Sequence, residues 1–213
     1  MGMMDIPEMK RIYKVKPVEF LAAMAALLGV MTFGILQGVV IGVALSIVWL
    51  VAVSALPYIP ELGRKPDTRA FFDLQQHPDG QIYPGLSIVR FDGGLFFVNA
   101  DALGDRLRDV RVHADPPLNG VILSMEGVNF MDAEGADAVK KIAQAGIDQG
   151  IDLHLARVKP QVMEVLDRDE VIDLIGAEHI HDDIAAAVEL HLKKHPSETT
   201  DSRAAPDSQP AVA

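Results

Sequence analysis

Cysteine is absent from all 213 residues of the chain. Without a thiol there is no disulfide framework, no thiolate metal site and no cysteine nucleophile. The glycine motifs that cradle phosphate groups do not occur, and neither does the G-x-S-x-G turn that presents a nucleophilic serine. The sequence therefore excludes the enzyme classes that depend on these motifs, and we expect no enzyme activity.

Charge is absent from residues 20–59, which contain no Asp, Glu, Lys or Arg. A helix of this length would extend about 60 Å, twice the hydrocarbon thickness of a bilayer. We therefore expect a two-pass membrane hairpin, with passes at about Pro17–Phe33 and Leu36–Leu56 joined near Gly34 and Ile35. A cleaved signal peptide is excluded, because its apolar region would be only about 7 to 15 residues long.

Basic residues flank this apolar stretch on both sides: Lys10, Arg11, Lys14 and Lys16 before it, and Arg64, Lys65 and Arg69 after it. Positive residues near membrane helices stay on the cytoplasmic side. We therefore expect a multi-pass protein of the cell (inner) membrane, surrounded by the lipid bilayer, with both ends in the cytoplasm.

Small residues recur at four-residue spacing in the second pass, at Gly34, Gly38, Gly42 and Ser46. Such a row lies on one helix face and allows another helix to approach closely. The alternative is that small residues are simply common in membrane helices. The row predicts packing against partner helices, either from further transporter segments or from a homodimer mate.

The net charge of −11 is spread unevenly. Residues 1–65 carry six Lys or Arg against four Asp or Glu, or +2, so residues 66–213 carry −13. A soluble part this acidic argues against nucleic acid as a partner.

Short apolar runs alternate with amphipathic segments after the hairpin. Strands are predicted at Leu86–Phe91, Leu95–Val98, Val121–Met125 and Ile151–Val158, and helices at Asn99–Val112, Ala133–Gln149, from Pro160, and at Asp182–Lys194. The first two strands should form a hairpin through Asp92, Gly93 and Gly94. This order indicates an α/β domain with a mixed central sheet and helices packed on it.

The expected organisation has four parts. Residues 1–59 form a basic approach and the two-pass hairpin, and residues 60–83, rich in proline and glycine, form a linker. Residues 84–195 form the α/β domain, and residues 196–213, rich in Ser, Pro, Asp and Ala, form a disordered tail.

The turn that joins a buried strand to the helix at Ala133 carries a resemblance to a known family. Its residues Asp132, Ala133, Glu134 and Gly135 resemble the regulatory turn of the STAS domain, the fold of anti-sigma-factor antagonists. The segments IPELGRKPDT, IYPGLSIVRFDGGLFFVNA and LARVKPQVMEVLDR resemble the carboxyl-terminal part of sulfate permease (SulP) transporters. In that family a final membrane pair runs through a proline-rich linker into a cytoplasmic STAS domain.

The turn departs from the family pattern at one position. Where antagonist-type STAS domains carry a phosphoacceptor serine after the aspartate, this chain has Ala133, so phosphorylation there is impossible. Asp132 and Glu134 would still favour the helix amino end. The turn is therefore either a regulatory site without phosphorylation or only a helix cap.

No cofactor is expected, and no metal site. The most concentrated group of possible ligands is His179, His181, Asp182 and Asp183. Its two histidines are separated by two positions and do not share a helix face, and a third ligand is not evident.

The resemblance implies the carboxyl-terminal portion of a secondary active transporter for sulfate or a related inorganic anion. In that family the anion site lies among many membrane helices that are not found here, so the chain should not transport by itself. The rival interpretation is a membrane-anchored STAS regulator whose domain binds a cytoplasmic signalling protein.

Overall fold

The computed structural model describes residues 17–66 and 68–196. The basic approach and the carboxyl-terminal tail predicted above lie outside these residues, apart from Pro196. The chain divides into two compact units, residues 1–55 and 56–213, which are described separately.

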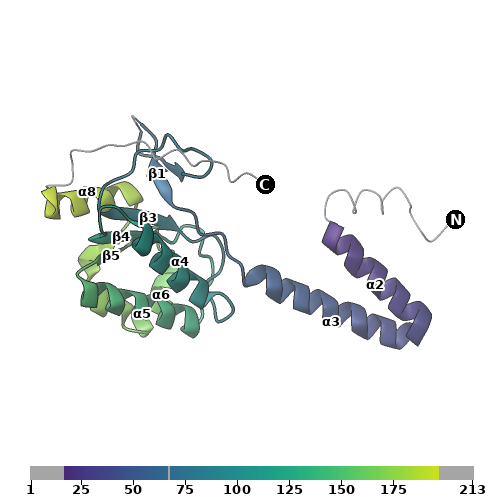
Figure 1. The fold of residues 1–213 in the computed structure, drawn as a ribbon. Helices are drawn as coiled ribbons and strands as arrows, with labels where there is room; N and C mark the ends of the chain where they lie inside the picture. Colours follow the sequence, from purple (N-terminus) through teal and green to yellow (C-terminus); the bar gives the residue numbers. More distant parts are fainter. Residues whose placement is uncertain (1–16, 67, 197–213) are drawn as a thin grey trace. The chain divides into compact units, whose positions relative to one another are not determined.

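The described part of the first unit contains two helices, α2 (Pro17–Phe33) and α3 (Ile35–Ser54), which pack against each other. Gly34 joins them with φ +94°, a backbone conformation that glycine adopts without steric cost. Among the described helices, α3 is long and apolar enough to cross a membrane. Helix α2 has 17 residues, the lower end of the range of about 17 to 25 that a span requires. The two predicted helical segments are thus confirmed as helices (Figure 1).

The second unit is built on a four-stranded parallel sheet in the order β3-β4-β5-β6. Its strands are β3 (Leu86–Arg90), β4 (Gly120–Ser124), β5 (Asp152–Ala156) and β6 (Ile180–His181). All of β4 is buried, as expected for a central parallel strand covered on both faces.

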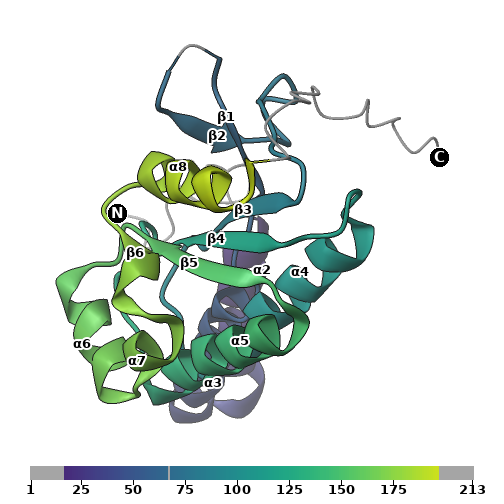
Figure 2. The same cartoon turned by 90° about the vertical axis from the view of Figure 1, so that its left-hand side faces the viewer.

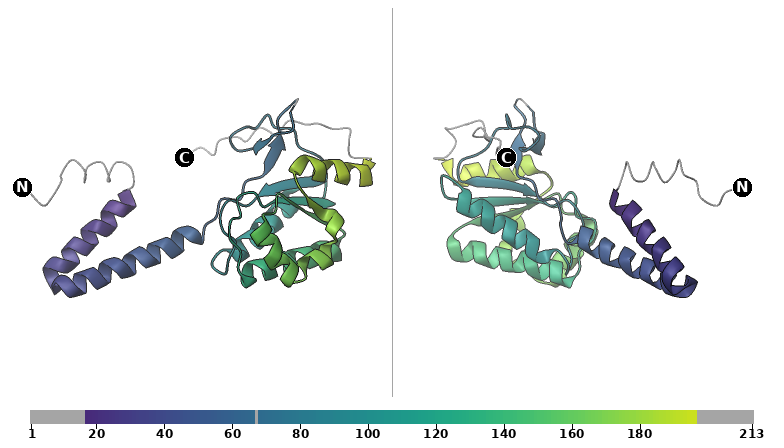
Figure 3. Two further views of the ribbon diagram at one scale, coloured as in Figure 1. Left: turned by 180° about the vertical axis from the view of Figure 1, so that it is seen from behind. Right: turned by 45° about the vertical axis from the view of Figure 1, so that its right-hand side comes forward.

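Helices cover both faces of this sheet (Figure 2, Figure 3). They are α4 (Ala100–His113), α5 (Ala133–Gln149), α6 (Pro160–Arg168), α7 (Val171–Ile175) and α8 (Ile184–Lys194), with a 3₁₀ turn, η1, at Ala177–His179. The larger core cluster contains residues of α4, α5, α6 and α7 together with Val121 and Leu123 of β4. The smaller cluster contains residues of α8 and Ile122 of β4. Ile122 lies between Val121 and Leu123, and its side chain points to the opposite face because successive strand residues alternate.

The predicted α/β fold is confirmed, but one predicted strand is wrong. Leu95–Val98 forms no strand beside β3; Leu95 makes a single parallel bridge to Met131, and residues 97–99 form a turn. Phe97 is exposed, whereas Leu95 is fully buried. The two phenylalanines at 96 and 97 favour a strand locally, but only Leu95 is drawn into the core.

The edge of β3 is instead occupied by the chain just after the first unit. The amides of Arg90 and Asp92 donate to the carbonyls of Pro60 and Tyr58, both at 3.0 Å, in an antiparallel arrangement. The four strands of the sheet are all parallel, and the antiparallel pairing that we predicted for residues 95–98 is replaced by isolated bridges from Tyr58 and Glu61.

Residues 60–83, predicted as a linker, contain two further strands, β1 (Leu62–Arg64) and β2 (Phe71–Asp73), which pair antiparallel. Leu62 is buried and packs in the smaller core cluster. The Tyr58 hydroxyl hydrogen-bonds to the Asp73 carboxylate. The prolines exclude a helix here, but the segment is folded onto the domain.

Candidate functional site

The turn before α5 is held by the carboxylate of Asp132. Its Oδ1 accepts the amide proton of Gly135 at 2.8 Å, which caps the helix, and its Oδ2 accepts the amide proton of Phe97 at 3.1 Å. One carboxylate thus fixes both the start of α5 and the loop that crosses in front of it.

Gly135 lies beneath that loop. A Cβ atom at this position would collide with the backbone carbonyl of Leu95, so only glycine permits the close approach. The amide of Leu95 in turn donates to the carbonyl of Phe130 at 2.9 Å. The loop and the turn are therefore one rigid backbone assembly.

Ala133 and Glu134 occupy the first turn of α5 and face solvent. Two exposed aromatic residues flank them: Phe97 is 69% exposed and Phe130 is 59% exposed. The ring of Phe96 lies between these two, with centroid distances of 6.0 and 6.3 Å. The sequence analysis missed this aromatic surface because it assigned residues 95–98 to a strand.

The basic side chains at the carboxyl ends of β3 and β5 are paired with acids. Arg90 donates to both carboxylate oxygens of Asp92 at 2.7 Å, and this bond raises the pKa of Arg90. Arg157 contacts Glu126 at 2.6 Å. The paired acids offset the charge of these two arginines, which weakens their attraction for a small anion.

The row of small residues on α3 has a structural role at one position. Gly38 is buried, and a Cβ atom there would come within 2.5 Å of the Val30 backbone on α2. Gly42 and Ser46 line a groove between the two helices together with apolar side chains. Thus Gly34 forms the turn, Gly38 makes the helix contact, and Gly42 and Ser46 continue along the open groove.

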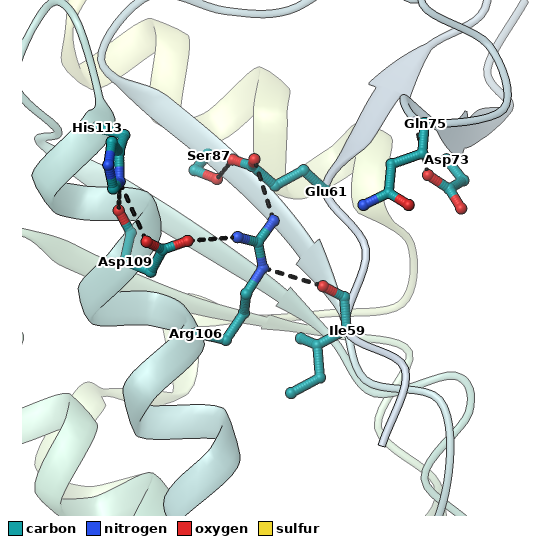
Figure 4. Close-up of polar contacts among 8 residues, drawn as sticks. All are labelled: Ile59, Glu61, Asp73, Gln75, Ser87, Arg106, Asp109 and His113. Atoms are coloured by element: carbon teal, nitrogen blue, oxygen red, sulfur yellow. Dashed lines mark hydrogen bonds and ion pairs between the residues drawn. The ribbon is translucent and has the colours of Figure 1, made fainter. Parts of the chain in front are cut away.

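Arg106 of α4 fastens the first residues of the second unit to the domain (Figure 4). Its Nε donates to the Ile59 carbonyl at 3.1 Å, and its two terminal nitrogens contact Glu61 at 3.3 Å and Asp109 at 2.8 Å. Glu61 also accepts a hydrogen bond from Ser87 of β3 at 2.9 Å. No local sequence pattern predicts this network, because Arg106 lies 45 to 47 positions from Glu61 and Ile59.

Comparison with known proteins identifies the second unit. The family profile described as "STAS domain" matches residues 77–187, just over half of the chain. The structure of the murine Slc26a9 anion transporter in its inward-facing state superposes with a TM-score of 0.79 at 20% identity, covering 86% of this chain and 30% of that protein. At that identity the similarity establishes the fold.

Two curated relatives match most of the sequence. A protein of Arabidopsis thaliana named "Probable sulfate transporter 4.2" is 33% identical over 183 residues, which cover 80% of this chain and 27% of that protein. A "Probable sulfate transporter" of Mycobacterium tuberculosis is 30% identical over 193 residues, covering 90% of this chain and 34% of that protein. The chain spans between about a quarter and a third of the length of these relatives. It belongs to the STAS family, and over most of its length it matches the carboxyl-terminal part of SulP sulfate transporters.

Proposed function

We propose that the chain acts as the carboxyl-terminal portion of a secondary active transporter for sulfate or a related inorganic anion. The observation that carries this proposal is the match of 90% of the chain to 34% of a protein named as a probable sulfate transporter. Because only a tenth of the chain lies outside that match, the match reaches into the hairpin at residues 17–54. A membrane-anchored STAS regulator would share the STAS domain, but it would not need similarity across the hairpin as well.

The hairpin needs partners in the membrane. Two helices cannot enclose an anion site at the bilayer midplane, which in transporters lies between several helices and their half-helix ends. The contact at Gly38 brings α2 and α3 together, and the groove along Gly42 and Ser46 remains open to a further helix. The occupants we propose are other transporter helices or a homodimer mate, and the chain alone does not transport.

The proposed topology is a multi-pass protein of the inner membrane with the STAS domain in the cytoplasm. Basic residues at both ends of the apolar stretch support it. Because cysteine is absent, single cysteines report on sidedness without background. In intact cells a membrane-impermeant maleimide should label Leu36→Cys, at the helix turn, and should label Gln75→Cys only after permeabilisation. Labelling of Gln75→Cys in intact cells would contradict this topology.

The STAS domain serves regulation or assembly rather than catalysis in this proposal. Its contact surface is the turn at Asp132, Ala133, Glu134 and Gly135, because exposed Phe97 and Phe130 flank it. A cytoplasmic protein would bind there constitutively, since Ala133 offers no hydroxyl group for a phosphate switch.

Sulfate uptake by a chimera tests the proposal. This chain replaces the matched third of the Mycobacterium tuberculosis relative, and the chimera is expressed in cells that lack sulfate transporters. We expect uptake above that of the same relative with its matched third deleted. Background uptake from a chimera that is demonstrably inserted in the membrane would overturn the proposal. An adjacent reading frame that encodes further membrane helices would support it, whereas an adjacent kinase would favour the regulator.

A further inference from the structure

Five of the seven histidines gather at one end of the sheet, on the face covered by α8. With one aspartate they form what we call the histidine cluster: Asp152 and His154 on β5, His179 in η1, His181 on β6, His191 on α8 and His195 directly after it. The sequence analysis expected no metal site, because it considered only His179, His181 and the two aspartates that follow. Folding adds residues that lie far apart along the chain.

His154 is the centre of the cluster and is 1% exposed. Ring centroids of His179, His181 and His191 lie 4.8, 5.2 and 5.7 Å from its own. Its Nδ1 lies 3.1 Å from Nε2 of His181, whereas its Nε2 is buried and has no hydrogen-bond partner within the described part of the chain. A buried polar atom without a partner is costly, and a water molecule or an ion bound there would satisfy it.

Donor atoms of three cluster residues lie close enough to share one ion. Asp152, His154 and His179 each offer an atom, and the three atoms lie within 4.8 Å of one another. Ligands of a tetrahedral Zn²⁺ with bonds of about 2.0 to 2.1 Å are separated by about 3.4 Å. The donor atoms would therefore have to move closer together by up to about 1.4 Å around the ion.

Hydrogen bonds to neighbouring groups prepare the histidines for this role. The Nδ1 of His179 bonds to the backbone carbonyl of Ile175, which leaves Nε2 as the nitrogen with a lone pair. If His154 donates its Nδ1 proton to His181, its own Nε2 also presents a lone pair. This outer shell of carbonyl and imidazole partners is the arrangement that orients metal-binding histidines.

The electrostatics of the cluster suit a cation. Burial, and then the charges of His179, His181 and His191, lower the pKa of His154 to about 3, so its imidazole is neutral at physiological pH. Burial raises the pKa of Asp152, but Lys194, His195 and His179 outweigh this effect and the pKa falls below its usual value. The site thus offers the neutral imidazole of His154 beside the carboxylate of Asp152.

We propose that Asp152, His154 and His179 bind a transition-metal dication of the Zn²⁺ type. Imidazole nitrogens favour Zn²⁺, Ni²⁺ and Cu²⁺ over the oxygen-seeking Mg²⁺ and Ca²⁺. A second triplet, Asp152, His191 and His195, also has its donor atoms within 4.8 Å and shares the same carboxylate. This proposal does not depend on a role in transport.

Lys194 competes with the ion for Asp152. Its ammonium group lies 2.6 Å from the Oδ2 atom of that carboxylate. The lysine side chain is 54% exposed and is free to turn toward solvent when the ion binds. Removing its charge should therefore tighten binding, which a cluster with only a packing role would not show.

Titration calorimetry of the full chain in detergent, carrying a tag without histidine and stripped of metal, tests the proposal with ZnCl₂. We expect one Zn²⁺ per chain, no binding of Mg²⁺, and affinity reduced at least tenfold by His179→Gln. His113→Gln, on the exposed surface of α4, is the matched control and should bind as the unaltered chain does.

Asp152→Asn and Lys194→Met complete the test without disturbing the core. Asp152→Asn should weaken Zn²⁺ binding, and Lys194→Met should strengthen it several-fold. The proposal would be overturned by the absence of Zn²⁺ binding, by equal affinity in His179→Gln and His113→Gln, or by an unchanged affinity in Lys194→Met. Circular dichroism checks that each variant is folded.

Discussion

Replacing Arg106 by alanine should release the residues that cover the edge of β3. The guanidinium bonds to the Ile59 carbonyl and to Glu61, both in that segment, and the arginine side chain is 27% exposed. A hydrogen bond from a charged donor to a carbonyl contributes about 1 to 2 kcal/mol, and a half-exposed ion pair about 0.5 kcal/mol. Arg106→Ala should therefore lower the free energy of opening of this segment by about 2 kcal/mol. The equilibrium constant for opening then rises about 30-fold.

Hydrogen exchange measured by mass spectrometry at single-residue resolution can detect this opening. The amides of Arg90 and Asp92, which donate to the segment, should exchange about 30-fold faster in Arg106→Ala. The amide of Phe91 lies between them but donates to Ser124 of β4, so its exchange should not change. The amide of Phe91 therefore serves as an internal reference at the same end of β3.

Arg108→Ala is the matched control for this prediction. Arg108 lies on the same helix, and its guanidinium forms an ion pair with exposed Asp105, three positions away, at 3.2 Å. Such a pair contributes about 0.3 kcal/mol, so exchange should change less than about twofold. Equal exchange at Arg90 and Asp92 in the two variants would refute the claim that Arg106 fastens the segment.

Four further substitutions test the packing described above. Asp132→Ala should destabilise the domain by about 0.5 to 2 kcal/mol in urea unfolding, because it removes a helix cap. It should also speed hydrogen exchange at the amide of Phe97, and unchanged exchange there would contradict the double role of Asp132. Leu62→Ala should lower the free energy of unfolding by about 2 to 4 kcal/mol, whereas Phe72→Ala, at a 38% exposed site, should lower it by less than half as much. Equal small losses of stability would mean that residues 60–83 are a linker. Gly38→Leu should separate α2 from α3 and cost about 1 to 3 kcal/mol of helix packing, seen as lower resistance of the purified chain to denaturing detergent, whereas unaltered resistance would remove Gly38 from the contact.

Local signals predicted those elements whose ends are marked by the residues themselves. Helix α5 begins at Ala133 and ends at Gln149 as predicted, because Asp132 caps one end and Gly150, with φ +68°, terminates the other. Pro160 likewise marks the start of α6.

Elements that depend on distant contacts were not predictable in the same way. Strand β6 has two residues and exists because Ile180 and His181 pair with β5. The histidine cluster joins β5 to residues 25 to 43 positions later in the chain, so its spacing carries no motif that a sequence reading could detect. The exposed aromatic pair at Phe97 and Phe130 depends on a crossing of two loops.

The central claim is that this chain contributes to anion transport only as part of a larger membrane assembly. The most direct test is radiolabelled sulfate uptake in cells without their own sulfate transporters, measured side by side for the chain alone and for the chimera, with membrane insertion of both verified. We expect background uptake for the chain alone and uptake above background for the chimera. Uptake by the chain alone, or background uptake by an inserted chimera, would contradict it.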